Sequence, residues 1–182
     1  MKHNLYFLIG PSASGKTTLL EKVKQQLNIK DILSCTTRKP REGEINGKDF
    51  YFISKAEFLQ KEKQGDFFYR LEAFDNYYSY EFPKVFNQDY IVIGYGDKIQ
   101  TYKEHLAGKV NLVFIFTMPP SQEELLERLQ QRYKNDQTKI RQRLEAVKYE
   151  MQFKDGCDYT IVTKDEEQTF EKFKKIFNKN KI

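Results

Sequence analysis

The sequence contains few of the residues on which disulfides, protein-bound metals and histidine catalysis depend. Its 182 residues include two cysteines, Cys35 and Cys157, and two histidines, His3 and His105. The cysteines lie too far apart in sequence to form a metal-binding pair, and we expect them to be reduced, structural thiols. The histidines are equally isolated, so histidine catalysis has little support.

Long apolar runs and a strong excess of one charge are also missing. No apolar run approaches the roughly 20 residues that a membrane span requires, and residues 1–4 lack the features of a secretory leader. We therefore expect a cytoplasmic protein without a membrane partner. The 31 basic and 26 acidic residues give a formal net charge of +5, which suits small anionic ligands but forms no stripe typical of nucleic-acid binding.

The most informative motif is the string G-P-S-A-S-G-K-T at residues 10–17, which fills every fixed position of the phosphate-binding loop G-x-x-x-x-G-K-[ST]. Apolar residues 5–9 predict a buried strand before it, and residues 18–27 predict a helix after it. Backbone N–H groups of such a loop converge on phosphate oxygens. The residues expected to bind a nucleoside triphosphate here are Ser12, Ala13, Ser14, Gly15, Lys16, Thr17 and Thr18.

Two side chains of the loop have expected chemical roles. Lys16 would reach the β- and γ-phosphates of the nucleotide. The hydroxyl of Thr17 would bind a magnesium ion that bridges these phosphates.

Strands and helices alternate along most of the chain. Further strands are expected at residues 31–35, 89–94, 110–118 and 159–162. A capping box at Ser121 and Glu124 predicts the start of one helix, and a last helix is expected over residues 165–177. This alternation predicts an α/β fold with a parallel sheet flanked by helices, whose ligands bind at the carboxyl ends of the strands.

Several motifs outside the loop resemble the guanylate kinase family. They are S-C-T-T-R-K-P-R-E-G-E-I-N-G at residues 34–47, N-Y-Y at 76–78, M-P-P-S at 118–121 and D-Y at 158–159. The string T-T-R-x-P-R-x-G-E is the specific part, because a phosphate loop alone fits many activities. The resemblance covers nearly the whole chain and ends near Asp158. It implies a P-loop kinase core that transfers a phosphoryl group from ATP, with Mg²⁺, to a nucleoside monophosphate.

The resemblance also implies how the chain is divided. Residues 1–182 would form one guanylate-kinase-like domain, a monomer or a homodimer with small-molecule nucleotides as its ligands. The core would comprise residues 1–33, 89–127 and 146–182. Residues 34–88 would be an inserted acceptor-binding subdomain, and residues 128–145 would be a short lid.

The arginines suit a reaction that brings two anionic substrates together. Arg38 and Arg41 offer planar forks for the acceptor phosphate, and Tyr78 adds a neutral donor. In the family the corresponding groups hold that phosphate. Arg132 and Arg143 would arrive with the lid and, with Lys16 and Arg38, form the catalytic set that stabilises the transferring phosphoryl group.

Two of the candidate residues have less specific roles. The family suggests that Arg128 stacks on adenine, with an ordinary exposed helix arginine as the alternative. Ser34 is kept in the acceptor pocket.

The acceptor pocket departs from the family at several positions. Tyr69 stands in the place of the glutamate that reads guanine, and Tyr80 replaces a small hydroxyl residue. Phe50 replaces a tyrosine, and the aspartates expected in a D-x-D pattern are missing from residues 91–96. Glu72 could supply another carboxylate, but a shift of three residues along a strand turns it to the opposite face.

These departures leave alternatives open. GMP or dGMP is the first acceptor to consider, and another nucleoside monophosphate or ribose 1,5-bisphosphate is the second. A non-catalytic binding module of the same fold is the third, although such modules typically have a degraded phosphate loop, whereas Lys16 and Thr17 are intact here.

The loop gives a direct test. Lys16→Met should lower turnover by about two orders of magnitude or more, because it removes a charge from the reacting phosphates, while the protein still folds. Steady-state ADP release and circular dichroism measure the two effects. Wild-type rates in the variant, or no ATP-dependent thermal shift of the wild type with magnesium, would contradict the kinase hypothesis.

Overall fold

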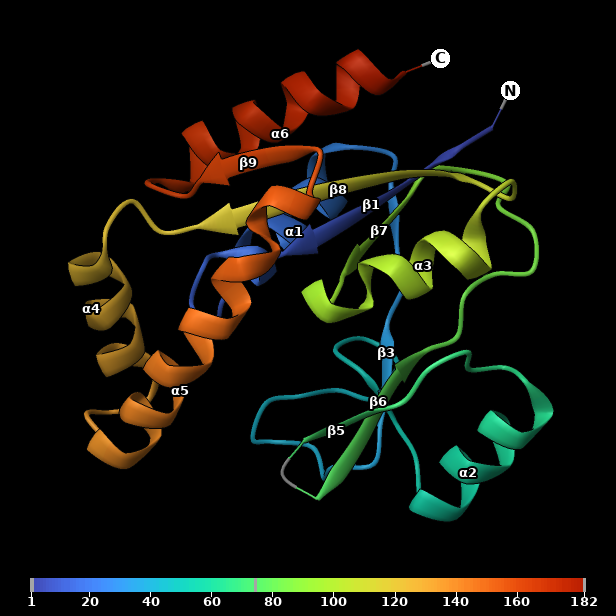
Figure 1. The fold of residues 1–182 in the computed structure, drawn as a ribbon, viewed down its shortest axis with the longest axis horizontal. Coiled ribbons are helices and arrows are strands. Elements are labelled where there is room, and N and C mark those ends of the chain that lie inside the picture. Colours follow the sequence, from blue (N-terminus) through green and yellow to red (C-terminus); the bar gives the residue numbers. More distant parts are fainter. Residues whose placement is uncertain (1, 74, 182) are drawn as a thin grey trace. The chain divides into compact units, whose positions relative to one another are not determined.

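The computed structural model describes residues 2–73 and 75–181 (Figure 1). The chain divides into two compact units. Residues Met1–Lys30 and Asn87–Ile182 form the first, which we call the core unit, and Asp31–Phe86 form the second, which we call the insert unit.

A five-stranded sheet forms the centre of the core unit, in the order β2-β7-β1-β8-β9. The central strand β1 pairs in parallel with β7 and with β8, and β8 pairs in parallel with β9. The strands are β1 (Asn4–Ile9), β2 (Lys30–Asp31), β7 (Tyr90–Ile93), β8 (Asn111–Met118) and β9 (Tyr159–Val162). The predicted α/β fold with a parallel sheet flanked by helices is therefore confirmed.

Helices lie between these strands, as crossovers of a parallel sheet require, and one more helix follows the last strand. They are α1 (Lys16–Gln26), α3 (Ile99–Leu106), α4 (Gln122–Arg132), α5 (Gln137–Glu150) and α6 (Glu166–Asn180), with short 3₁₀ helices η1 (Gly96–Lys98) and η2 (Met151–Gly156). Figure 1 shows α3 on one side of the sheet and α1 on the other. Among the described residues, no helix has the length and apolar character needed to cross a membrane.

One face of the sheet packs on α1 and α6. Tyr6 and Leu8 of β1 join Val23 of α1 and the α6 side chains Phe170 and Phe173 in one buried cluster. The ring of Phe173 meets that of Tyr6 edge-on, with centroids 5.5 Å apart. The aromatic side chains of the last helix are thus part of the core.

The opposite face of the sheet is closed by aromatic rings. Because neighbouring residues of a strand point to opposite faces, the side chain of Phe7 lies on the face opposite that of Tyr6 and Leu8. It stacks on Tyr102 of α3 and on Phe114 of β8, with centroids 4.4 and 4.9 Å away. Gly94, directly after β7, fits this packing because a Cβ atom there would lie 2.8 Å from the Phe7 ring.

Helices α4 and α5 form a hairpin with a cap at the start of each helix. The Ser121 hydroxyl accepts the N–H of Glu124, and the Asp136 carboxylate accepts the N–H of Lys139. Between the helices the backbone turns through Lys134 and Asn135, both with positive φ. Most of the segment expected as a lid is therefore helical.

The insert unit contains a four-stranded mixed sheet in the order β4-β3-β6-β5. Its elements are β3 (Ser34–Thr36), β4 (Tyr51–Phe52), α2 (Lys55–Gln64), β5 (Leu71–Ala73) and β6 (Asn76–Tyr80). Strand β3 pairs in parallel with β4 and antiparallel with β6. Cys35, Phe58 of α2 and Phe67 form the buried cluster of this unit.

The prediction of a single strand at residues 31–35 is wrong. It is two short strands, β2 and β3, which belong to different sheets. The apolar run through Ile32 and Leu33 looks continuous in sequence, but the chain leaves one hydrogen-bonded ladder and enters another there.

Candidate phosphate-binding and acceptor sites

The phosphate loop, residues 10–17, is held against the carboxyl end of β8. Gly10 has φ 142°, and a Cβ atom on it would lie 2.1 Å from the carbonyl oxygen of Thr117, so only glycine fits. The Thr117 hydroxyl lies 3.2 Å from the carbonyl oxygen of Ile9 and 2.8 Å from the Ser14 hydroxyl. The loop therefore starts from a backbone that β8 fixes.

The first turn of α1 is open to an anion. Gly15 is the N-cap residue of α1, in the left-handed conformation with φ 83°, and it has no side chain that could accept the first N–H groups. Thr17 and Thr18 are both exposed in this turn. Free N–H groups and the helix dipole together favour a negatively charged ligand at such a position.

Lys16 folds back along the loop. Its ammonium group donates to the carbonyl oxygens of Gly10 and Pro11 at 2.6 and 2.7 Å. The pKa of Lys16 is lowered from 10.5 to about 8, mainly by burial, with the nearby Glu150 carboxylate acting in the opposite direction and the charge of Arg132 adding to the decrease. A triphosphate would restore a strongly charged lysine here, because anionic oxygens favour the protonated form.

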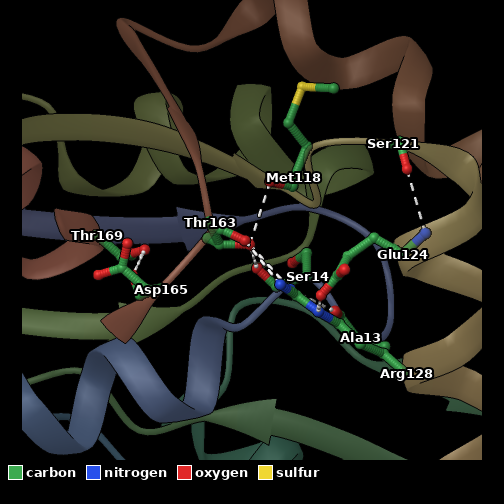
Figure 2. Close-up of polar contacts among 9 residues, drawn as sticks. All are labelled: Ala13, Ser14, Met118, Ser121, Glu124, Arg128, Thr163, Asp165 and Thr169. Atoms are coloured by element: carbon green, nitrogen blue, oxygen red, sulfur yellow. Dashed lines mark hydrogen bonds and ion pairs between the residues drawn. The ribbon is translucent and has the colours of Figure 1, made fainter. Parts of the chain in front are cut away.

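Arg128 of α4 is bound to Thr163, which itself contacts the loop (Figure 2). Its guanidinium donates to the carbonyl oxygen of Thr163 at 2.7 Å and to the Thr163 hydroxyl at 3.1 Å. A weaker contact of 3.5 Å reaches the carbonyl oxygen of Ala13. Glu124 binds the Arg128 Nε at 3.0 Å, so this side chain is not a free surface arginine.

Thr163 joins four parts of the core unit. It follows β9 directly, and its hydroxyl lies 3.0 Å from the carbonyl oxygen of Ser14 and 3.2 Å from that of Met118 (Figure 2). The same hydroxyl accepts from Arg128. The phosphate loop, β8, β9 and α4 therefore share one hydrogen-bonded centre.

Apolar packing connects the α4–α5 hairpin to the loop as well. Ala13, which has a positive φ of 63°, packs against the buried cluster of Leu125, Leu129 and Ile140. These residues come from both helices of the hairpin. The conformation at Ala13 is unusual for a residue with a Cβ, and the cluster around it supports that conformation.

Glu150, the last residue of α5, meets the loop from the other helix. Its carboxylate accepts the backbone N–H of Ser12 at 3.3 Å. Burial raises the pKa of Glu150, against the opposing effects of Lys16, the Ser12 N–H and Arg143. Arg143, on the same helix, is thereby placed near this carboxylate, while Arg132 is exposed and lies with its guanidinium 5.8 Å from the Tyr133 ring centroid.

In the insert unit, Arg38 is held by a carboxylate of the chain itself. Its two terminal nitrogens each donate to one oxygen of Glu44, both at 2.6 Å. The guanidinium also stacks over the Phe50 ring, 4.8 Å from its centroid, and interacts with the Tyr78 phenol. Glu44 raises the pKa of Arg38 as the main effect, and it accepts the backbone N–H of Arg41 at 2.7 Å.

The remaining acceptor candidates lie on or beside one face of the insert sheet. Ser34 pairs with Tyr80 and Thr36 with Tyr78 across the β3–β6 ladder, and residues directly opposite each other share a face. The Ser34 hydroxyl donates to the carbonyl oxygen of Ser79 at 3.1 Å. Glu72 pairs with Tyr77, and Tyr77 faces α2. Glu72 therefore lies on the α2 face of the insert sheet, opposite the face that carries the acceptor candidates.

Aromatic rings surround the two tyrosines that depart from the family. Tyr69 and Tyr80 are both buried. Phe68 lies 5.6 Å from Tyr69, and Phe82 lies 5.8 Å from Tyr80, between ring centroids. Phe68 and Phe82 stack on each other at 5.2 Å. The position where the family has a carboxylate is thus part of an aromatic cluster.

Sequence reasoning missed three residues that the structure places at these sites. They are Thr163, Glu150 and Glu44. Glu44 lies in the T-T-R-x-P-R-x-G-E string, so its motif was a usable signal. Thr163 and Glu150 carry none, because each contacts the loop from about 140 or more positions away in sequence.

Comparison with known proteins decides the family. The family model described as guanylate kinase matches residues 2–180. The chain belongs to the guanylate kinase family. It is 34% identical to the guanylate kinase of Wolbachia sp. subsp. Brugia malayi, over 98% of this chain and 93% of that protein. It is 38% identical to that of Mycoplasmopsis pulmonis, over 98% and 95%.

A solved structure agrees with this assignment. The crystal structure of guanylate kinase from Anaplasma phagocytophilum matches all of this chain and 86% of that chain, with a TM-score of 0.76 and 26% identity. The chain is therefore a nucleoside monophosphate kinase with the P-loop kinase fold, in a family that uses ATP.

The lowered pKa of Lys16 predicts a pH dependence. With a pKa of about 8, the lysine of the ligand-free protein loses its charge as the pH rises through 8. ATP affinity should therefore fall about tenfold or more between pH 7 and 9.5, since binding must first restore the proton. Isothermal titration calorimetry across this range measures the change.

Two variants identify the titrating group. Lys16→Met should lose this pH step, and Lys175→Met, which changes an exposed lysine of α6, should keep it. Burial raises the pKa of Cys35 to about 11 and that of Cys157 to about 12, so neither thiol titrates in the window. A pH step that survives in Lys16→Met would contradict the assignment.

Proposed function

We propose that the chain transfers the γ-phosphoryl group of ATP to GMP, giving ADP and GDP. The observation that carries this proposal is the complete phosphate loop, with Lys16 and Thr17, in a chain whose curated relatives named guanylate kinase match it over 98% of its length. A degraded loop would have favoured a binding module, and this loop is supported by contacts at almost every residue.

Magnesium enters the proposal through Thr17. Thr17 is an exposed residue of the first turn of α1, which begins with N–H groups that favour phosphate. The described residues contain no group of three His, Cys, Asp or Glu side chains that could hold a metal ion. Mg²⁺ fits such a site, because it keeps several waters and is commonly held by one or two protein oxygens and the nucleotide phosphates. The ion would neutralise charge on the phosphates.

The charged groups of the chain would have three separate roles, namely binding the donor, binding the acceptor phosphate and stabilising the transferring group. The core unit would bind the donor through residues 12–18, with Lys16 on the phosphates. The insert unit would bind the acceptor phosphate through Arg38, Arg41 and Tyr78, with Ser34 beside the base. Arg132 and Arg143 on the α4–α5 hairpin would stabilise the transferring group. Phosphoryl transfer of this kind needs positioning and charge more than a general base.

The base of the acceptor nucleotide could be one other than guanine, and this is the alternative within the proposal. Guanine presents N–H groups that a carboxylate accepts well, and Tyr69 offers a phenol instead, within an aromatic cluster. A site that loses a hydrogen-bond acceptor discriminates less between bases. A relaxed or altered base preference, with another monophosphate as a competing acceptor, is the alternative that these residues favour.

Four arginine variants test the division of labour. Arg38→Ala and Arg41→Ala should chiefly raise the KM for the acceptor, by about tenfold or more, because a charged hydrogen bond to phosphate is lost. Arg132→Ala and Arg143→Ala should chiefly lower kcat. Steady-state kinetics with each substrate varied separates the two effects.

Matched controls are available in both units. Arg70→Ala removes an exposed arginine that pairs with Glu62 and Glu72, and Arg141→Ala removes an exposed arginine of α5. Both should leave the kinetics nearly unchanged. If all four test variants altered ATP affinity alone, the division of labour would be wrong.

An acceptor screen tests the activity itself. ADP release is measured with GMP, dGMP, AMP, CMP, UMP, IMP and ribose 1,5-bisphosphate. We expect GMP to be phosphorylated.

The double variant Tyr69→Glu, Tyr80→Ser tests how the base is bound. It should raise kcat/KM for GMP by about five- to a hundredfold, because a charged hydrogen-bond acceptor for the guanine N–H groups is regained. Tyr51→Ser, at an exposed tyrosine of the same unit, is the control. Preference for ribose 1,5-bisphosphate, or no ADP release with any acceptor, would refute the proposal.

A further inference from the structure

Two neighbouring residues of the phosphate loop are held by the two helices of the α4–α5 hairpin. Arg128 of α4 approaches the carbonyl oxygen of Ala13 at 3.5 Å, and Glu150 of α5 accepts the N–H of Ser12 at 3.3 Å. The two contacts differ in kind. Arg128 binds carbonyl oxygens, which do not bind phosphate, whereas Glu150 binds an N–H group of the loop, which is the kind of group that does.

The position of Glu150 is fixed by the segment that follows it. Phe153 of η2 packs on Gly96 so closely that a Cβ atom on Gly96 would lie 2.4 Å from the Phe153 ring. Asp158 then closes onto β8, with its carboxylate accepting the N–H of Phe114 at 2.7 Å. The end of α5 is therefore anchored on the sheet, and the carboxylate at the loop is not the free end of a mobile surface side chain.

The charge of Glu150 acts on the same groups that an anionic ligand would use. Its carboxylate takes the Ser12 N–H, and it attracts the charge of Lys16, the second anion-binding group of the loop. A carboxylate and a phosphate both accept N–H groups and both attract lysine, so they compete when they address the same donors.

We propose that Glu150 is an internal competitor of the donor nucleotide, which holds the Ser12 N–H and weakens triphosphate binding at the loop. The polyphosphate must displace this carboxylate, and the affinity of the loop is set below what its N–H groups and Lys16 would otherwise give. Glu150 is thus a residue that tunes donor affinity. The inference rests on the proposed function in one respect, namely that residues 10–17 bind the donor.

The test compares two glutamates of the same helix. Glu150→Gln keeps the size and one acceptor oxygen but removes the charge, and Glu145→Gln makes the same charge change at an exposed position of α5. Calorimetry measures the Kd of ATP with magnesium and the Kd of inorganic tripolyphosphate for the wild type and both variants. We expect Glu150→Gln to bind both ligands about threefold to tenfold more tightly, and Glu145→Gln to match the wild type.

Kinetics distinguish competition from a structural role. Under the proposal, Glu150→Gln lowers the KM for ATP. If Glu150 instead organised the loop, the variant would bind both ligands more weakly and raise that KM. Glu150→Ala, which removes charge and oxygens together, should show the same direction as Glu150→Gln and serves as the second variant. Equal or weaker binding in both Glu150 variants overturns the inference.

The two ligands keep this inference separable from the proposed function. A wild-type protein that binds tripolyphosphate but never phosphorylates a monophosphate would refute the proposed function, and the tripolyphosphate comparison would still decide the role of Glu150. A wild-type protein that binds neither ligand would overturn both.

Discussion

The structure depends on one constraint, which is that the backbone of residues 10–17 must present N–H groups to a phosphate, although those of Ser12 and Ser14 already donate to Glu150 and to the carbonyl oxygen of Pro11. A loop with this requirement cannot be stabilised by the usual ladder hydrogen bonds. Its other polar atoms are bound instead. The Thr117 and Thr163 hydroxyls contact Ser14, and Lys16 binds the carbonyl oxygens of Gly10 and Pro11. The sheet order places β8 beside β1 and β9 beside β8, and these two strand ends supply both threonines.

Much of the core unit could be predicted because its signals are local. The phosphate loop is a contiguous motif, β8 is an apolar run that a Pro-Pro pair ends, and β9 has the bounds expected from its sequence. The start of α4 is signalled by Ser121 and Glu124, and the Ser121 hydroxyl does accept the Glu124 N–H. Each of these features depends on residues within a few positions of one another.

The rest could not be predicted because it depends on contacts between distant positions. The break between β2 and β3 is a change of hydrogen-bonding partner, and the apolar residues Ile32 and Leu33 carry no sign of it. Arg128 looked like a helix arginine with two possible roles until its bonds to Thr163 were seen, 35 positions away. The chemistry of a residue type limits what it can do, but its partner decides what it does.

In each of the two candidate anion-binding sites, a carboxylate of the chain itself binds the donor groups. Glu44 binds the fork of Arg38 and the N–H of Arg41, and Glu150 binds the N–H of Ser12. Carboxylates of this kind hold donors that a phosphate would also use, so the two anions compete. The chain therefore organises its cationic groups with its own anions.

The packing at Gly94 has a consequence for how this sequence can change. The aspartates expected at the end of β7 are absent, and the Phe7 ring, stacked on Tyr102, leaves no room for a Cβ atom at residue 94. An aspartate introduced there alone would collide with a filled core before it could bind anything. Residues 7, 94 and 102 therefore constrain one another's substitutions, and a carboxylate at residue 94 requires that the Phe7 ring move or be replaced by a smaller side chain.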